Sequence, residues 1–68
     1  MNTKLINIAI EYLKHKKVCS LSWLVYYCYY TNNDFNLSFE EIEAIIVTNY
    51  KNNFVLFEEN KVRFVKYG

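Results

Sequence analysis

Apolar residues recur every three or four positions at the start of the chain, which predicts a first α-helix over Thr3–Lys16. Its stripe consists of Leu5, Ile8, Ala9 and Tyr12, widened by Ile6, Ile10 and Leu13. Lys14, Lys16 and Lys17 close the C-terminal end, where cations complement the helix dipole. The next two residues, Val18 and Cys19, are expected to form a short extended link.

Two separate apolar faces are predicted on a second helix, residues 21–31, with Ser20 as its N-cap. The aliphatic face has the spacing i, i+3, i+4, i+7 and consists of Leu21, Leu24, Val25 and Cys28. The aromatic face consists of Trp23, Tyr26, Tyr27 and Tyr30, with Tyr29 at its margin. Because a chain this small rarely buries both faces of one helix, the aromatic face is a candidate interaction surface.

A third helix, residues 38–50, follows the polar break at 31–34. Ser38 and Glu41 have the spacing of a capping box, and Leu37 and Ile42 that of a hydrophobic staple. The side chains expected to face inward are Phe39, Ile42, Ile45, Ile46 and Tyr50. Those expected to face outward are Glu40, Glu43, Ala44, Val47 and Lys51, with Glu41 beside them.

Residues 54–67 predict a β-hairpin that turns at Glu59 and Asn60. The expected pairs are Phe54 with Val65, Val55 with Phe64, Leu56 with Arg63, Phe57 with Val62, and Glu58 with Lys61. Since side chains alternate along a strand, one face is entirely apolar and is expected to lie inward: Val55, Phe57, Val62 and Phe64. The other face carries the charges. A hairpin of this kind needs support from other elements.

The predicted order of helix, short strand, helix, helix and hairpin is typical of an α+β winged-helix fold, here one domain over residues 1–68. Three stretches resemble parts of the HARE-HTH family: residues 19–28 have the apolar spacing of its helix two, 37–42 resemble the start of its helix three, and 54–64 resemble its wing. That family includes the N-terminal domain of the bacterial RNA polymerase delta subunit. The resemblance implies a winged helix with a transcription-linked role, although the family's Gly or Pro near the first link and the turn is absent here.

The composition predicts a small domain with a well-filled core. The chain has 68 residues, of which 53% are hydrophobic and 19% aromatic, with one Gly and no Pro. The net charge of +1 and the pI near 7.7 are too weakly basic to indicate nucleic-acid binding by themselves. The bias toward Asn, Lys, Ile and Tyr is compatible with an AT-rich phage, viral or low-GC bacterial genome.

The residues needed for catalysis or metal binding are not found in a recognisable pattern. Cys19 and Cys28 are nine positions apart with His15 nearby, which does not match a zinc site. They are expected to be reduced, buried thiols, with a disulfide as the alternative. No Gly-rich phosphate loop or nucleophile–base pair is present, so we expect no enzyme activity, cofactor or small-molecule substrate. No membrane helix or signal peptide is expected, which favours a cytoplasmic or nuclear protein.

Two functions therefore remain open. The first is protein–protein contact, with a different protein or with a second copy, through Trp23, Tyr26, Tyr27 and Tyr30. The second is contact with duplex DNA phosphates through basic residues of the hairpin and of the end of the first helix: Lys61, Arg63, Lys66, Lys14, Lys16 and Lys17. The glutamates of the third helix oppose its insertion into a DNA groove. These glutamates and the basic residues could instead form solvated surfaces, and the N-terminal arm or the hairpin could instead cover the aromatic face.

Overall fold

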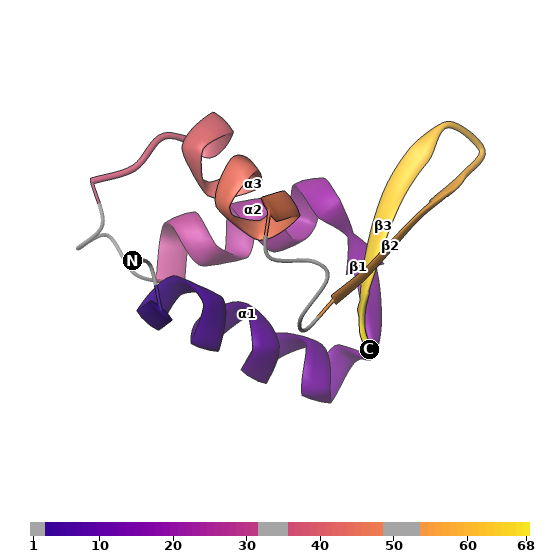
Figure 1. Ribbon diagram of the computed structural model, residues 1–68, viewed down its shortest axis with the longest axis horizontal. Helices are drawn as coiled ribbons and strands as arrows, with labels where there is room; N and C mark the ends of the chain where they lie inside the picture. Colours follow the sequence, from indigo (N-terminus) through magenta and orange to yellow (C-terminus); the bar gives the residue numbers. More distant parts are fainter. Residues whose placement is uncertain (1–2, 32–35, 49–53) are drawn as a thin grey trace.

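The structure, a computed structural model, describes residues 3–31, 36–48 and 54–68 and has an α+β architecture (Figure 1). The elements in chain order are α1 (Thr3–Lys16), β1 (Val18–Ser20), α2 (Leu21–Thr31), α3 (Phe39–Thr48), β2 (Phe54–Glu59) and β3 (Val62–Tyr67). The predicted helices and hairpin are confirmed within these ranges. The polar break at 32–34 and the predicted inward Tyr50 and outward Lys51 lie outside the described residues.

The helix ends follow the predicted capping chemistry. The Ser20 hydroxyl accepts a hydrogen bond from the Trp23 amide at 3.1 Å, as an N-cap does. In the capping box, the Ser38 amide donates to the Glu41 carboxylate at 2.9 Å and the Glu41 amide donates to the Ser38 hydroxyl at 3.2 Å. At the end of α1, Lys17 has a φ of 74° and its amide donates to the Leu13 carbonyl, which is a left-handed C-terminal cap.

The aliphatic face of α2 is fully buried, as predicted, and forms the middle of the core. Leu21, Leu24, Val25 and Cys28 are all inaccessible to solvent or nearly so. Around them lie buried side chains from every other layer: Leu5, Ile6, Ala9 and Leu13 from α1, Ile42 and Ile46 from α3, and Phe54 and Val65 from the sheet. In α1 the buried stripe is rotated from the predicted one, since Ile8 and Tyr12 are only half-buried.

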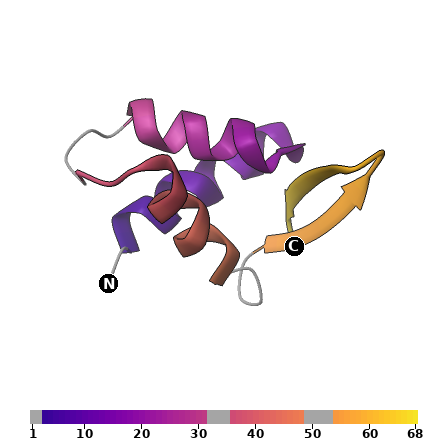
Figure 2. The ribbon, with the colours of Figure 1, turned by 90° about the horizontal axis from the view of Figure 1, so that it is seen from above.

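The three strands form one antiparallel sheet in the order β1-β3-β2. The predicted extended link is β1, which pairs Val18 with Lys66, Cys19 with Val65 and Ser20 with Phe64. The sheet therefore joins the start of α2 to the end of the chain. The hairpin of β2 and β3 reaches away from the three helices, so that only its base lies beside them (Figures 1 and 2).

The predicted hairpin register is wrong, because the turn lies one residue further along the chain than predicted. The turn is formed by Asn60 and Lys61, and Phe57 pairs with Phe64 rather than with Val62. Asn60 and Lys61 have φ values of 53° and 66°, as a two-residue type I′ turn requires. Asn adopts this left-handed conformation more readily than Glu does. The observed register also closes six pairs between β2 and β3, one more than the predicted register allowed.

The predicted inner face of the hairpin is also wrong. The residues assigned to it form the outer face of the sheet: Val55, Phe57, Val62 and Phe64. The shift in register moves each partner by two residues, so the division into two faces is unchanged. The face that packs on the core contains Phe54 and Val65, with Leu56 half-buried beside them. The opposite face is largely open to solvent, and Val55, Phe57 and Val62 are each between 38% and 46% exposed.

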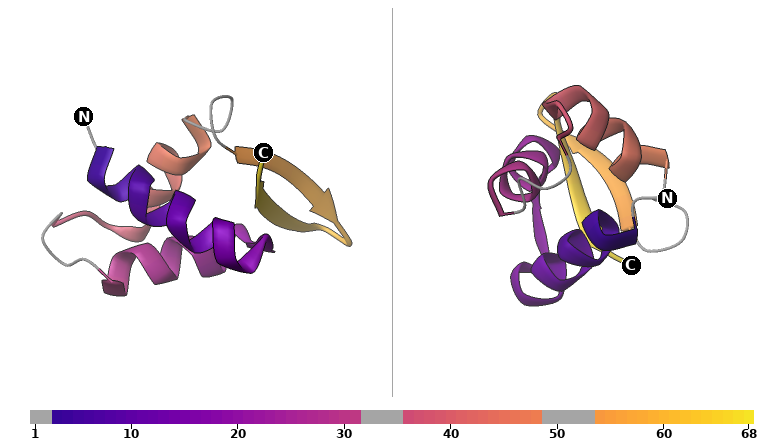
Figure 3. Two further views of the ribbon diagram at one scale, coloured as in Figure 1. Left: turned by 90° about the horizontal axis from the view of Figure 1, so that it is seen from below. Right: turned by 90° about the vertical axis from the view of Figure 1, so that its left-hand side faces the viewer.

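The two faces were misassigned because both are apolar near the helices. The inner face holds Phe54, Leu56 and Val65, and its charged pair, Glu58 opposite Arg63, lies toward the turn. Both residues of this pair are exposed, so their charges stay accessible to water. The turn end of the hairpin extends past the helices (Figure 3). Alternation alone therefore could not show which row faces the core.

We expect two alanine substitutions on β3 to separate the two faces. Val65 is fully buried, so Val65→Ala should lower the free energy of unfolding by about 2 kcal/mol through the lost contacts and the cavity left behind. Val62 is 46% exposed, so Val62→Ala should change it by less than about 0.5 kcal/mol. Urea denaturation followed by circular dichroism measures both, and equal losses would contradict the observed faces.

A glycine in the turn should stabilise the hairpin. Lys61 has a positive φ, a conformation that a Cβ atom disfavours, so Lys61→Gly should raise the free energy of unfolding by about 0.5–1 kcal/mol. The matched control is Lys61→Ala, which removes the same charge but keeps the Cβ atom and should give no gain. A destabilised Lys61→Gly variant in the same denaturation experiment would argue against the turn at Asn60 and Lys61.

Candidate functional site

The aromatic face of α2 is largely open to solvent. Trp23, Tyr26 and Tyr30 are 52%, 48% and 59% exposed, because burial of the aliphatic face turns them outward. Their rings form a continuous row along the helix, with centroids 6.1 Å apart for Trp23 and Tyr26 and 4.6 Å apart for Tyr26 and Tyr30. A side-chain hydrogen bond with Tyr26 raises the pKa of Tyr30 above its ordinary value.

A fourth exposed ring comes from α3. Phe39 was predicted to face inward, but it is 42% exposed, and that prediction is wrong. Its ring lies 5.8 Å from that of Tyr26 and 4.3 Å from that of Tyr29. As the first residue of α3, it has no preceding helical turn of α3 to cover it. We call Trp23, Tyr26, Tyr30 and Phe39 the aromatic surface.

Tyr27 does not belong to the aromatic surface, although its spacing predicted that it would. It is half-buried against α1, where its ring lies 4.2 Å from that of Tyr12. The Tyr12 hydroxyl also accepts a hydrogen bond from the indole N–H of Trp23. Tyr12 therefore closes one edge of the surface and fixes the orientation of Trp23.

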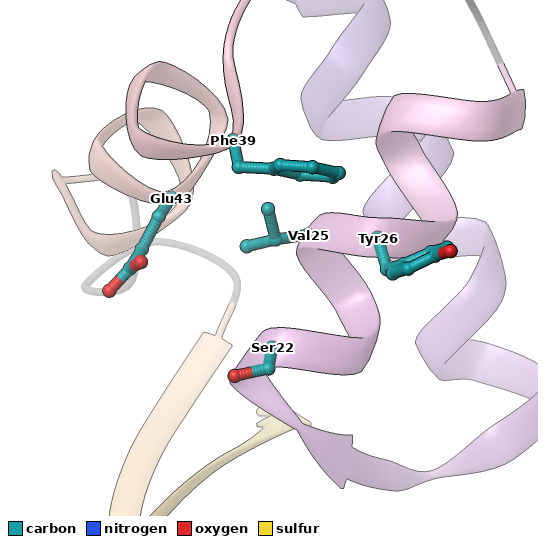
Figure 4. A pocket seen from close by; sticks show the side chains of 5 residues that line it. All are labelled: Ser22, Val25, Tyr26, Phe39 and Glu43. Carbon is teal, nitrogen blue, oxygen red and sulfur yellow. The ribbon is translucent and has the colours of Figure 1, made fainter.

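A hollow of about 270 Å³ opens between α2 and α3 beside the aromatic surface. It is lined by Ser22, Val25, Tyr26, Phe39 and Glu43 (Figure 4). The Phe39 ring reaches from α3 toward α2 above Val25, while the Glu43 carboxylate lies at the edge of the hollow (Figure 4). Sequence reasoning missed the hollow because its lining comes from both faces of α2 and from the start of α3.

An ion pair joins the acidic helix α3 to strand β3 of the basic hairpin. The Arg63 guanidinium lies 3.6 Å from the Glu43 carboxylate, and both side chains are about half exposed. Glu43, predicted to face outward, is accordingly half-buried. The predicted phosphate contact of Arg63 would have to compete with this carboxylate. A pair this exposed contributes little to stability, at most about 1 kcal/mol.

Several of the predicted basic residues belong to segments whose backbones adjoin at one corner of the fold. The Tyr67 amide donates to the Lys17 carbonyl at 3.4 Å, and the Lys14 ammonium lies 5.7 Å from the centre of the Tyr67 ring. Lys66 is paired with Val18, directly after that end of α1. We call this cluster the basic corner: Lys14, Lys16, Lys17 and Lys66. Lys61 is in the turn at the other end of the hairpin.

The two thiols are free in the structure, Cys28 buried and Cys19 half-buried. Burial, with a smaller effect of Cys19, raises the pKa of Cys28 to about 12. Burial also raises the pKa of Cys19, although Lys16 acts in the opposite direction. Thiols with raised pKa values are poor nucleophiles at neutral pH, so this pair adds no reactive centre to the site.

Within residues 3–31, 36–48 and 54–68, no three His, Cys, Asp or Glu side chains are close enough to hold a metal ion. In the same described parts of the chain, no helix has the length and apolar character needed to cross a bilayer. Comparison of the chain with protein-family models, curated proteins and solved structures found no significant match to any of them. The function is therefore inferred from the surfaces described above.

Proposed function

We propose that this chain is a small, non-enzymatic winged-helix module that binds a protein partner through the aromatic surface. The observation that carries the proposal is a set of four exposed rings from two helices, three of them arranged around Tyr26, at the edge of an apolar hollow. Trp and Tyr dominate the energetics of protein interfaces, particularly where they flank a pocket. Exposed aromatic area of this kind is uncommon in proteins that act alone.

The winged-helix assignment is supported by the order of the elements. A strand between the first two helices pairs with the second strand of a C-terminal hairpin, which gives the sheet order β1-β3-β2. The suggested place in transcription or another DNA-linked process depends on the resemblance to the HARE-HTH family. A fold of this kind is shared by proteins of different function, so the binding surface is the stronger part of the proposal.

We expect Tyr26→Ser combined with Tyr30→Ser to weaken partner binding without unfolding the chain. Both hydroxyphenyl groups are about half exposed, so their loss should affect the interface far more than the core. Truncation of hot-spot aromatics should weaken the complex at least about tenfold. The measurement is affinity capture from the native host, followed by calorimetric titration of the captured protein against purified variants.

The matched control is Tyr67→Ser, which removes an exposed tyrosine from β3, outside the aromatic surface. It should leave the affinity unchanged. Equal binding by the wild-type chain and the double variant would rule out the aromatic surface. A symmetric dimer through α2 is the other form of the same hypothesis, and it would appear as self-association that only the double variant loses.

Direct binding to duplex DNA is the second candidate, and the basic corner favours it. Lysines from the end of α1 and the end of β3, separate in the sequence, lie on adjoining elements. A cluster of this kind could follow a phosphate backbone. Arg63 is paired with Glu43, so the middle of the hairpin is poorly suited to bind phosphates. The carboxylates of Glu40 and Glu41 at the start of α3 would repel phosphates there.

If DNA is bound at the basic corner, Lys16→Gln combined with Lys66→Gln should weaken the affinity and reduce its dependence on salt. Each phosphate contact removed should lower the slope of log K against log salt concentration by about 1. Lys61→Gln, in the distant turn, is the control and should change neither quantity. Fluorescence anisotropy with labelled duplex at two salt concentrations measures both, and no binding of the wild-type chain at low salt would eliminate this candidate.

A further inference from the structure

The outer face of the sheet is a second apolar surface, separate from the aromatic surface. By the observed register it presents three cross-strand pairs of the hairpin and two residues of β1. The apolar members are Val18, Val55, Phe57, Val62 and Phe64, and the polar members are Ser20, Glu59 and Lys66. We call these eight residues the outer sheet face. Four of the five apolar side chains are more than a third exposed.

The charges on this face are arranged in a definite order. The middle pair is Phe57 with Phe64, whose rings stack with centroids 5.5 Å apart. Glu59 lies in the pair on the turn side of these rings, and Lys66 lies in the pair on the opposite side. The Lys66 ammonium is held over this face, 5.9 Å from the centre of the Phe57 ring. One negative and one positive group thus flank an aromatic centre.

This order makes the outer sheet face complementary to itself. Two sheets stack face to face at about 10 Å through interlocking side chains. A two-fold axis that crosses the strands at the Phe57–Phe64 pair places the turn-side pair of one copy on the Lys66 side of the other. Glu59 of each copy then approaches Lys66 of its neighbour, and this happens twice. A two-fold axis along the strands would instead bring like charges together, which is unfavourable.

We propose that the outer sheet face is a homodimer interface, in which two copies stack their hairpins across a two-fold axis through Phe57 and Phe64, with two Glu59–Lys66 ion pairs at its ends. The face has eight residues, whereas a standard interface has roughly 20–30 on each side. The dimer is therefore weak, with a dissociation constant on the order of 100 μM. The aromatic surface lies on α2 and α3 and remains free for a different partner.

Charge reversal in sedimentation equilibrium of the full chain tests this interface. Glu59→Lys and Lys66→Glu, made singly, each place like charges together and should weaken the dimer roughly tenfold. The double variant Glu59→Lys/Lys66→Glu recreates both ion pairs in the opposite sense and should restore it. Net charge does not explain such a result, because Lys66→Glu changes it from +1 to −1 and leaves its magnitude unchanged.

Two further variants test the apolar part of the interface. Phe57→Ser should abolish association up to about 1 mM, whereas Tyr26→Ser with Tyr30→Ser should leave it unchanged. Circular dichroism of each variant confirms that it is folded, and Val62→Ser replaces Phe57→Ser if the latter is not. Three results would overturn the proposal: a wild-type monomer at 1 mM, failure of the double charge reversal to restore association, or loss of association in the Tyr26/Tyr30 variant alone.

Discussion

The structure depends on the burial of one face of α2. Leu24 and Cys28 are completely inaccessible, and α1, α3 and the sheet all contribute side chains to the cluster around them. An 11-residue helix with no charged residue has no polar side with which to face water. Its second face must therefore be exposed as aromatic rings, and the tyrosine hydroxyls reduce the cost of that exposure. The same packing that forms the core creates the candidate binding surface.

Local sequence signals predicted the helices well because their determinants are short in range. Ser20 and Ser38 act as caps within three residues of their partners, and the i, i+3, i+4, i+7 spacing of α2 identified its buried face. The rotation of the α1 stripe was not predictable in this way. Tyr12 lies at the edge of the core, where its ring contacts Tyr27 and its hydroxyl accepts a hydrogen bond from Trp23, and both partners belong to another helix.

The sequence-based predictions were wrong or incomplete where the outcome depends on contacts between segments that are distant in the chain. Both rows of the hairpin are largely apolar, with one acidic and one basic residue each, and only its packing against the helices and its pairing with β1 decide that Val65 is buried and Val62 exposed. The ion pair between Arg63 and Glu43 is likewise invisible in the sequence, because charges on separate elements become neighbours only after folding. The aromatic surface was predicted in large part, whereas Phe39 and the hollow beside it were not.

The pairing of β1 with β3 has a consequence for biosynthesis. Val18 and Lys66 are far apart in the sequence but pair in the sheet, and the Tyr67 amide donates a hydrogen bond to the Lys17 carbonyl. During translation, β1 and the buried face of α2 emerge long before the strand that completes their sheet. All three helices precede β3 in the chain, so the sheet can form only after β3 has been synthesised and released. A stall or cleavage before β3 would leave a nascent chain with its core open to aggregation.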